Sequence, residues 1–521
     1  MPAKNIAFSA RERSLIRTVT EAGPRTKLLI GALALVFGWG LYAYVYQLRH
    51  GLAATDMHEY ALWGLYITNF VFFIGISHVG ALMSAILRIT HAEWRRPITR
   101  MAEVITFSAL LFGAVMPIVD LGRPEHILNL LFHPNLQSPI VWDLLCIFTY
   151  LVGSSIFLYL PLIPDIALMR DGVQGLAGWR RVVYRVLSLN WQNTPAQHER
   201  LERAMGIMAV LIIPIAVAVH TVVAFIFSMT LRPGWNSTIF GPYFVAGALV
   251  SGAAAVMVAM AILRRVYHLE AYITLQHFRN LAILVFTFDL FYIYFNIAEY
   301  FTMGYKIEEG ERALLLALMG GAYAPAFWLT QLGGLLLPAF LLLVPSLKPL
   351  RLLRGLRVLR PAALGLIVLL EGLTLIGPVR TVLAQSWITS AGPAPLLSVW
   401  VFVGLLGLLF ISLLPLLHAH PIPTYVLAGL LIVVQAWIKR YLIVVPTLMN
   451  PLLPVEPAPL EWLRYNPTWV EWSITAGSLA GFVLVYVLFT KVFPIVSIWE
   501  TRETPAPAGR PAAYEAGEAK A

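Results

Sequence analysis

Ionisable side chains interrupt the long apolar runs of this 521-residue sequence. A charge near the centre of a bilayer costs roughly 2.5–3.5 kcal/mol on insertion scales, so each one needs a structural or chemical reason. Histidines and carboxylates can bond a ligand and move its protons, and a nearby cation can hold an acid ionised. The candidates are His78, Glu103, Asp120, Arg123, Asp143, His220, Asp289, Glu299, Glu371, Lys439 and Arg440.

His78 lies between two glycines in the segment Gly75–Gly80. Glycines allow a neighbouring helix or a ligand to approach closely. Two interpretations of His78 follow: a hydrogen bond that joins two helices, or a contact with a lipid-soluble ligand that also relays a proton. His220, in a separate apolar run, has the same two interpretations.

Asp120 and Arg123 are separated by two residues, just before Pro124, and their spacing predicts an ion pair at a helix end. That pair either fixes the loop or forms the wall of a pocket in which Asp120 accepts a proton from a reduced substrate. Glu103, near the other end of the same run, either reaches the membrane surface or belongs to this site. A proton path or internal ion pairs would account for Asp289, Glu299, Lys439 and Arg440.

Metal ligands are scarce. Cys146 is the single cysteine, so the chain alone cannot bind an iron–sulfur cluster or complete a four-thiolate zinc site, and it lacks the Cys-x-x-Cys-His motif of covalent haem. Two histidines within apolar runs, His78 and His220, leave one haem with two axial ligands formally open. We expect neither haem nor an iron–sulfur cluster in this chain.

The composition places these residues in membrane helices. Hydrophobic residues make up 59% of the chain and charged residues 12%, against roughly 25% charged in soluble proteins. We predict an all-α polytopic membrane protein with 10–12 transmembrane helices, counted as twelve. The segments are 28–48, 60–88, 98–119, 140–165, 204–230, 241–265, 278–303, 323–345, 361–383, 396–418, 423–447 and 473–497.

Basic residues set the predicted orientation. With the N-terminus in the cytoplasm, 28 of the 37 Lys and Arg residues fall on the cytoplasmic side and seven on the other. Both termini are therefore expected in the cytoplasm. This distribution explains the net charge of +10 by membrane topology and contact with anionic lipids rather than by nucleic-acid binding.

We divide the chain into seven regions. These are a cytoplasmic N-terminal segment (1–27), a peripheral first helix with its outer loop (28–58), a first helical bundle (59–230), the start of a second bundle (231–345), extra helices (346–422), C-terminal helices (423–500) and a disordered cytoplasmic tail (501–521).

Several segments together resemble the NrfD-like family of quinone-interacting membrane subunits, whose type example is the polysulfide reductase membrane subunit. These are Trp63–Asn69, Gly75–Gly80, Ala102–Glu103 and Asp120–Pro124. Four more look most like the larger NrfD-like, quinol-oxidising subunit of bacterial alternative complex III: Ser138–Asp143, Trp235–Tyr243, Lys439–Pro446 and Tyr465–Trp469. The resemblance covers most of residues 55–345 and 423–500.

The resemblance implies two four-helix bundles and a menaquinol or ubiquinol substrate that is oxidised near the periplasmic side of a bacterial inner membrane. It also implies three partners: a periplasmic iron–sulfur or molybdopterin-like subunit, a multihaem cytochrome c and a second NrfD-like membrane subunit. Carried over residue by residue, it places the quinol pocket at His78, Asp120 and Arg123, with Glu103 and His220 as further members. His78 and Asp120 would be catalytic.

Such subunits usually have ten spans, and the excess here falls at about 350–418. Two alternatives within the family are the reverse reaction, quinone reduction in a polysulfide or molybdopterin-type reductase, and a bare membrane anchor for redox partners. A twelve-helix secondary transporter is the rival from another class, and it predicts two similar halves.

Overall fold

The computed structural model describes residues 8–173, 177–346, 413–450 and 464–502, together with positions 361 and 365. Within these ranges, ten helical segments are long and apolar enough to cross a membrane. They match ten of the twelve predicted spans. The predicted spans at 361–383 and 396–418 lie almost entirely outside the described residues, as does Glu371.

The candidate spans have the following bounds. They are α2 (Pro24–His50), α3 (Leu65–Ile89), α4 (Thr99–Asp120), α6 (Pro139–Tyr159), α9 (Pro195–Ser228), α10 (Phe240–Val266), α11 (Leu275–Lys306), the segment Ala324–Ser346, α19 (Pro421–Leu448) and α20 (Trp469–Val492). Ala324–Ser346 combines α13 (Ala324–Trp328), a π-helical stretch η4 (Leu329–Leu336), α14 (Leu337–Leu343) and the 3₁₀ turn η5 (Val344–Ser346).

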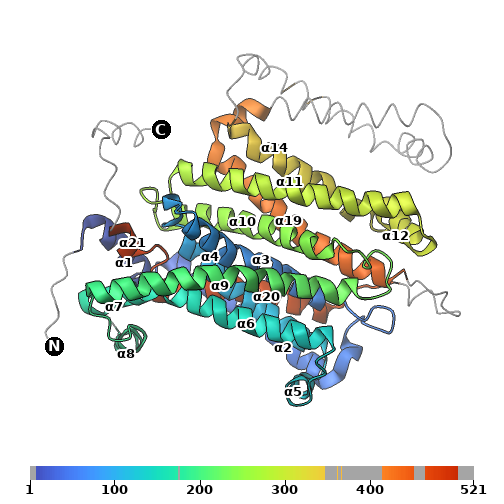
Figure 1. The fold of residues 1–521 in the computed structure, drawn as a ribbon, viewed down its shortest axis with the longest axis horizontal. Helices are drawn as coiled ribbons and strands as arrows, with labels where there is room; N and C mark the ends of the chain where they lie inside the picture. Colours follow the sequence, from blue (N-terminus) through green and yellow to red (C-terminus); the bar gives the residue numbers. More distant parts are fainter. Residues whose placement is uncertain are drawn as a thin grey trace.

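Two groups of four helices form the core. In the first, α3 packs on α4 and α9, and α6 packs on α4 and α9. In the second, α10, α11, α14 and α19 pack on one another, and α10 also contacts α3 and α9 (Figure 1). The remaining pair, α2 and α20, packs against α4 at the edge of the first bundle.

Glycines allow the closest helix contacts. A Cβ added at Gly80 of α3 would overlap the Ala102 carbonyl of α4, and one added at Gly40 of α2 would lie 2.7 Å from the Cα of Gly477 in α20. Small residues are the usual means by which membrane helices approach this closely. The glycine after His78 therefore serves the α3–α4 contact.

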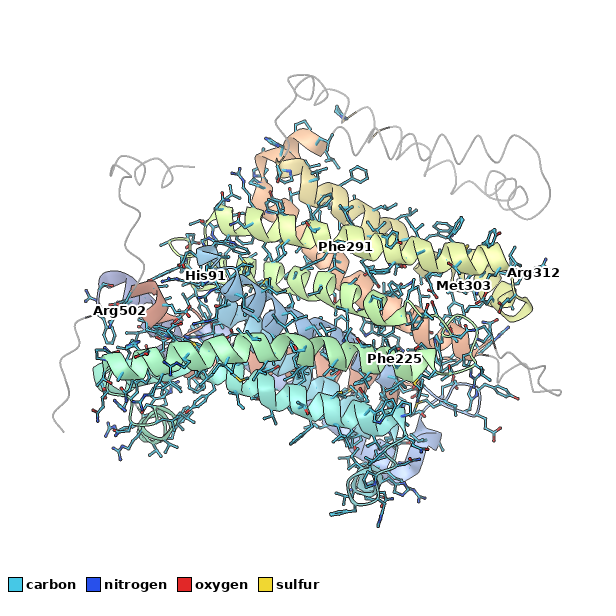
Figure 2. All side chains as sticks on the ribbon, viewed as in Figure 1. His91, Phe225, Phe291, Met303, Arg312 and Arg502 are labelled. Atoms are coloured by element: carbon cyan, nitrogen blue, oxygen red, sulfur yellow. The ribbon has the colours of Figure 1, made fainter. Side chains whose placement is uncertain are left out.

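The two ends of the bundles carry different short elements. The inner end, named for the predicted orientation, has α1 (Ala10–Thr20), η2 (Glu93–Arg95), α7 (Leu162–Gly172), α8 (Gly178–Leu187) and α21 (Ile498–Arg502); the outer end has η1 (Gly51–Ala54), η3 (Pro124–His126), α5 (Ile127–Phe132) and α12 (Glu309–Met319). In Figure 2, His91 and Arg502 mark the inner end, and Met303 and Arg312 the outer end. Both ends of the described chain thus lie on one side.

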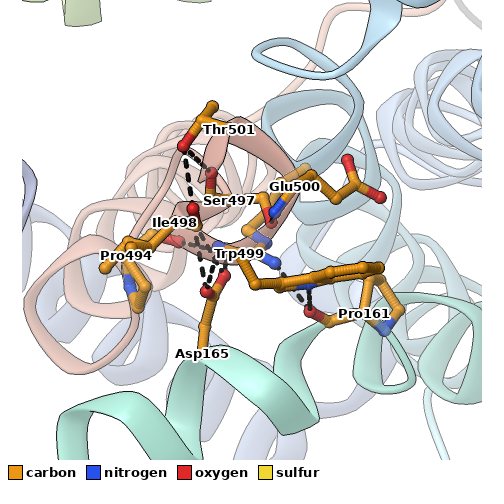
Figure 3. Close-up of polar contacts among 9 residues, drawn as sticks. Pro161, Asp165, Pro494, Ser497, Ile498, Trp499, Glu500 and Thr501 are labelled. Carbon is orange, nitrogen blue, oxygen red and sulfur yellow. Dashed lines mark hydrogen bonds and ion pairs between the residues drawn. The ribbon is translucent and has the colours of Figure 1, made fainter. Parts of the chain in front are cut away.

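A buried ion pair closes the inner end of the first bundle. Arg100 of α4 donates to Asp165 of α7 at 2.5 Å, and both side chains are almost completely buried. The Asp165 carboxylate also accepts the backbone N–H groups of Ile498 and Trp499 at the start of α21 (Figure 3). A carboxylate at the N-terminus of a helix interacts favourably with the positive end of the helix dipole. Asp165 therefore attaches the C-terminal segment to the bundle.

Candidate functional site

Two histidines meet at the centre of the first bundle. His78 of α3 and His220 of α9 are fully buried, and their ring centroids are 4.1 Å apart. Tyr150 of α6 packs against His78 at 5.0 Å. Rings this close leave no space for a porphyrin between them, so the pair does not fit the two axial ligands of one haem.

The two imidazoles differ in their hydrogen bonds. Both ring nitrogens of His78 meet backbone carbonyls, Nδ1 with Ile74 at 2.7 Å and Nε2 with Ala216 at 2.6 Å. A neutral imidazole has one N–H, so it donates to one of these carbonyls. His220 has no hydrogen-bond partner at either nitrogen among the described residues. The geometry therefore makes His78 a link between α3 and α9 and leaves both nitrogens of His220 unbonded within the described chain.

An apolar groove follows the same part of α9. It is an open groove of about 450 Å³ along α9, α10 and α11, and it is lined almost entirely by apolar side chains. Val217 and Thr221 form its α9 wall, and Phe291 of α11 (labelled in Figure 2) lines another side. His220 lies between these two residues in the sequence, but its side chain is buried against His78 and does not line the groove. The complete lining is Val217, Thr221, Pro242, Val245, Ala246, Leu249, Phe288, Phe291 and Phe295.

The expected ion pair between Asp120 and Arg123 does not form. No bridge of 4.0 Å or less joins these two described residues, and the Arg123 side chain is exposed. Asp120 ends α4, and the chain then turns at Gly122, whose φ is +67°. Arg123 follows this turn. The Asp120 Oδ1 atom is instead buried, with no hydrogen-bond partner in the described part of the chain.

The predicted quinol pocket is also not one site. Next to Asp120, the Val119 carbonyl accepts from Gln47, which in turn accepts from Tyr66 at 2.5 Å. At a rise of about 1.5 Å per residue, Tyr66 and His78 are about 18 Å apart along α3. Asp120 therefore lies at the outer end of the bundle and His78 near its middle. The sequence prediction placed them together because it rested on the resemblance of short motifs, which does not show how deep in the membrane each residue lies.

Glu103 lies at a third depth in the first bundle, near its inner end. It lines a small cavity of about 20 Å³ together with Arg88, Arg95, Arg100 and Glu500. Glu500 bridges Arg88 and Arg95, each at 3.7 Å. Burial raises the pKa of Glu500, and the positive charges of Arg95, Arg88 and Arg100 oppose this rise. Glu103 thus belongs to the inner charged network and not to the histidine pair.

A buried carboxylate at the outer end of the bundles was not predicted from the sequence. Glu471 of α20 is fully buried and accepts from the Asp56 N–H, the Thr468 N–H and the Tyr465 hydroxyl. The same hydroxyl accepts from the Leu65 N–H at 2.9 Å. Thr468 and Glu471 form a capping box. The Thr-x-x-Glu spacing after Tyr465 was the signal that could have revealed it.

The outer part of the second bundle holds Lys439. Its ammonium group donates to the Tyr300 hydroxyl and lies 5.7 Å from the Tyr243 ring centroid. Glu299 accepts from Ser237 at 2.9 Å, and it lines the same small cavity of about 30 Å³ as Lys439. No ion pair within 4.0 Å joins these two described residues. Glu299 and Lys439 therefore lie around the same cavity as Tyr243 and Tyr300.

Arg440 links the two bundles. Its guanidinium donates to Tyr292 of α11 at 3.2 Å and occupies the space left by two glycines, because a Cβ on Gly75 would lie 3.4 Å from it and one on Gly247 3.0 Å. Asp289, one turn before Tyr292, is fully buried, and neither of its oxygens has a partner within the described ranges. Asp143, near the start of α6, has one carboxyl oxygen without a partner in the described chain.

One face of α11 carries the polar residues of this cluster. Asp289, Tyr292, Asn296 and Glu299 recur every three or four residues, which places them on the same side of a helix. Asn296 accepts from the Tyr243 hydroxyl at 2.9 Å, and the Tyr243 and Tyr292 rings are stacked at 5.2 Å. This row of polar residues, called the polar ladder below, covers the middle and outer parts of α11. Asn296 was not predicted as a site residue, although its spacing from Asp289 and Glu299 is visible in the sequence.

These features define a class of protein: a polytopic helical bundle with a central histidine pair, an apolar groove beside it and a polar ladder. Among the described residues, no three His, Cys, Asp or Glu side chains are arranged to hold a metal ion. The profile of the family "Polysulphide reductase, NrfD" matches residues 53–384, more than half of the chain. The chain belongs to the NrfD family.

Several relatives are membrane components of redox enzymes. The chain is 31% identical to a putative dimethyl sulfoxide reductase membrane subunit of Halobacterium salinarum, over 61% of this chain and 70% of the relative. It is 25% identical to a selenate reductase subunit of Mesobacillus selenatarsenatis (63% and 77%) and 24% identical to an Hdr-like menaquinol oxidoreductase integral membrane subunit of Archaeoglobus fulgidus (61% and 71%). These names support the NrfD family without singling out alternative complex III.

Proposed function

We propose that this chain is the quinone-reactive membrane subunit of a reductase-type oxidoreductase complex. The observation that carries the proposal is His220, a fully buried imidazole whose two nitrogens lack partners among the described residues, beside an apolar groove in an NrfD-family fold. A quinone has a polar headgroup and a long apolar tail. The groove suits the tail, and His220 suits a headgroup oxygen.

The chemistry follows from the balance of quinol oxidation. A quinol loses two electrons and two protons; the electrons pass to the partner protein, one headgroup proton goes to a ring nitrogen of His220, and the other goes to solvent. In quinone reduction the same atoms work in reverse, with His220 donating. His78 is held by the backbone carbonyls of Ile74 and Ala216 and packs against His220, so we assign it the role of a positioning residue.

The partner we propose is an iron–sulfur or molybdopterin-type protein outside the membrane. Relatives named as dimethyl sulfoxide and selenate reductase subunits favour such a reductase over the quinol-oxidising alternative complex III with its cytochrome c. The orientation we propose, with both termini in the cytoplasm of a bacterial cell, is supported by the distribution of Lys and Arg.

Proton exchange with the membrane surfaces is a further part of the proposal. The polar ladder from Asp289 to Glu299, with Lys439 and Arg440, supplies side chains at successive depths of the second bundle. Asp120 and Glu103 lie at the outer and inner ends of the first bundle and would serve as exchange points there.

The test uses the intact complex purified with its native partners. Turnover is measured with a soluble quinol and with the corresponding quinone for the wild type, His220→Gln, His78→Gln and the exposed control His91→Gln. We expect His220→Gln to lower quinone-linked turnover by about 100-fold or more while partner activity with an artificial electron donor is retained. Normal quinone-linked turnover in His220→Gln would overturn the assignment.

A further inference from the structure

The short helix α8 at the inner end has three distinct faces. One face packs on the bundle: Tyr184 is fully buried and donates to the Val492 carbonyl at 2.6 Å, and Arg180 donates to the Lys491 carbonyl at 3.0 Å. The Tyr159 hydroxyl donates to the Leu187 carbonyl at 2.7 Å at the end of the helix. These bonds hold α8 in a fixed orientation.

The second face is apolar and exposed. Trp179, Val182 and Val186 are 55%, 59% and 64% exposed, and their spacing of three and four residues places them in one row. In Figure 1, α8 lies beyond the side of the bundle at the inner end, next to α7. An apolar row at this depth of a membrane protein adjoins the boundary between headgroups and acyl chains.

The third face is basic. Arg181 and Arg185 are exposed, one turn apart, and neither forms an ion pair within 4.0 Å among the described residues. Seen down the helix axis, they lie on the opposite flank of the exposed surface from the apolar row. This arrangement puts two guanidinium groups at the level of phosphates when the apolar row enters the membrane.

We propose that α8 is a membrane-surface binding site for anionic phospholipid headgroups. Trp179, Val182 and Val186 enter the acyl boundary, and Arg181 and Arg185 bind the phosphates from the flank. Charge complementarity identifies the occupant, because the inner end also carries most of the Lys and Arg residues. The contacts with Val492 and Lys491 preorganise the helix, so little freedom is lost on binding.

The first experiment locates the apolar face. Spin labels are attached at Val182→Cys, Val186→Cys and Arg181→Cys in a Cys146→Ala background, and the full chain is reconstituted in vesicles. We expect the labels at 182 and 186 to be more accessible to oxygen than to a water-soluble nickel chelate, and the label at 181 to show the reverse. Labels at 182 and 186 that are exposed to the chelate would overturn membrane insertion and leave this face to a protein partner.

The second experiment tests the headgroup. Binding of phosphatidylglycerol, phosphatidylcholine and inorganic phosphate to the detergent-solubilised protein is measured by native mass spectrometry. We expect phosphatidylglycerol to be preferred and the Arg181→Gln/Arg185→Gln variant to bind it about 25-fold more weakly, at about fivefold per arginine. The matched control Arg200→Gln, also exposed at the inner end, should bind normally. Equal binding by both variants, or inorganic phosphate as good a ligand as the lipid, would overturn the proposal.

Discussion

The inner end and the centre of the first bundle differ in how far their buried polar side chains are hydrogen-bonded. At the inner end, Arg100 and Asp165 bond each other and also the backbone of Pro161 and of the C-terminal segment, and the Arg100 Nε atom alone of this pair lacks a partner in the described chain. At the centre, neither nitrogen of His220 is bonded within the described chain. An unpaired buried polar group costs stability, so each such group calls for a partner from outside the described chain, such as a water molecule or a ligand. The contrast separates residues that hold the fold from residues available for chemistry.

The largest effect is expected from breaking the inner ion pair. Arg100→Ala leaves Asp165 as an uncompensated buried charge, which typically costs about 3–5 kcal/mol. A loss of that size should appear as a lower melting temperature in detergent. The comparison variant is Arg203→Ala, whose partner Glu199 and own side chain are both about 70% exposed, and for which about 0.5 kcal/mol or less is expected. Similar melting temperatures for the two variants would contradict the structural role of Arg100.

The histidines should separate stability from activity. His78→Gln disturbs two contacts with backbone carbonyls and is expected to destabilise the protein by about 1–3 kcal/mol. His220→Gln breaks no hydrogen bond of the described residues, so its melting temperature should stay near that of the wild type. Thermal unfolding of the two variants in detergent measures the difference. A His220 variant that is the less stable of the two would mean that its role is structural.

The outer carboxylate extends the comparison to the other end. Tyr465→Phe removes a donor to Glu471 and an acceptor for the Leu65 N–H. We expect a loss of about 1–3 kcal/mol, because both groups remain buried. Tyr305→Phe is the control, since this tyrosine is 81% exposed. Unchanged melting of Tyr465→Phe would show that Glu471 is satisfied without it.

Asp289 resembles His220, since its carboxyl oxygens also lack partners in the described part of the chain. Asp289→Asn removes this acid without breaking a described hydrogen bond, so stability should be unchanged or slightly higher. If the polar ladder carries protons, the Asp289→Asn variant in the reconstituted complex should take up fewer protons. Its electron transfer to the partner, measured with a protonophore added, should persist. Lower stability with normal proton uptake would instead assign Asp289 a structural role.

The smallest effect concerns pH at the inner end. Because burial raises the pKa of Glu500 above its ordinary value of 4.5, the folded protein holds this proton more tightly than the unfolded chain. The resulting stability is fully present below pH 4.5 and is lost as the pH rises through the folded pKa. Glu500→Gln should flatten this part of the curve of melting temperature against pH. A curve unchanged by the substitution would exclude Glu500 as its source.

The sequence predicted the helices better than it predicted the site. Apolar length and Lys/Arg placement suffice for spans, which is why ten predicted segments match the structure. The site depends on depth and facing direction. Motif resemblance could not show that Asp120, His78 and Glu103 lie at different depths, or that Gly122 turns Arg123 away from Asp120.

Hydrogen bonds were the other missing information. From the sequence, His78 and His220 had the same two interpretations, and only the carbonyls of Ile74 and Ala216 distinguish them. The Arg100–Asp165 pair joins residues far apart in the chain, so no local pattern indicated it. Glu471 and the polar ladder of α11, in contrast, had visible spacing and were within reach of the sequence.

The most direct test of the account is to find where the quinone headgroup binds. A photoreactive azidoquinone is crosslinked to the purified complex, and the labelled peptides are mapped with and without excess natural quinone. The account predicts displaceable labelling of α9 and α3 around His220 and His78. Displaceable labelling confined to the outer end, at Asp120 and the turn after it, would contradict the central assignment.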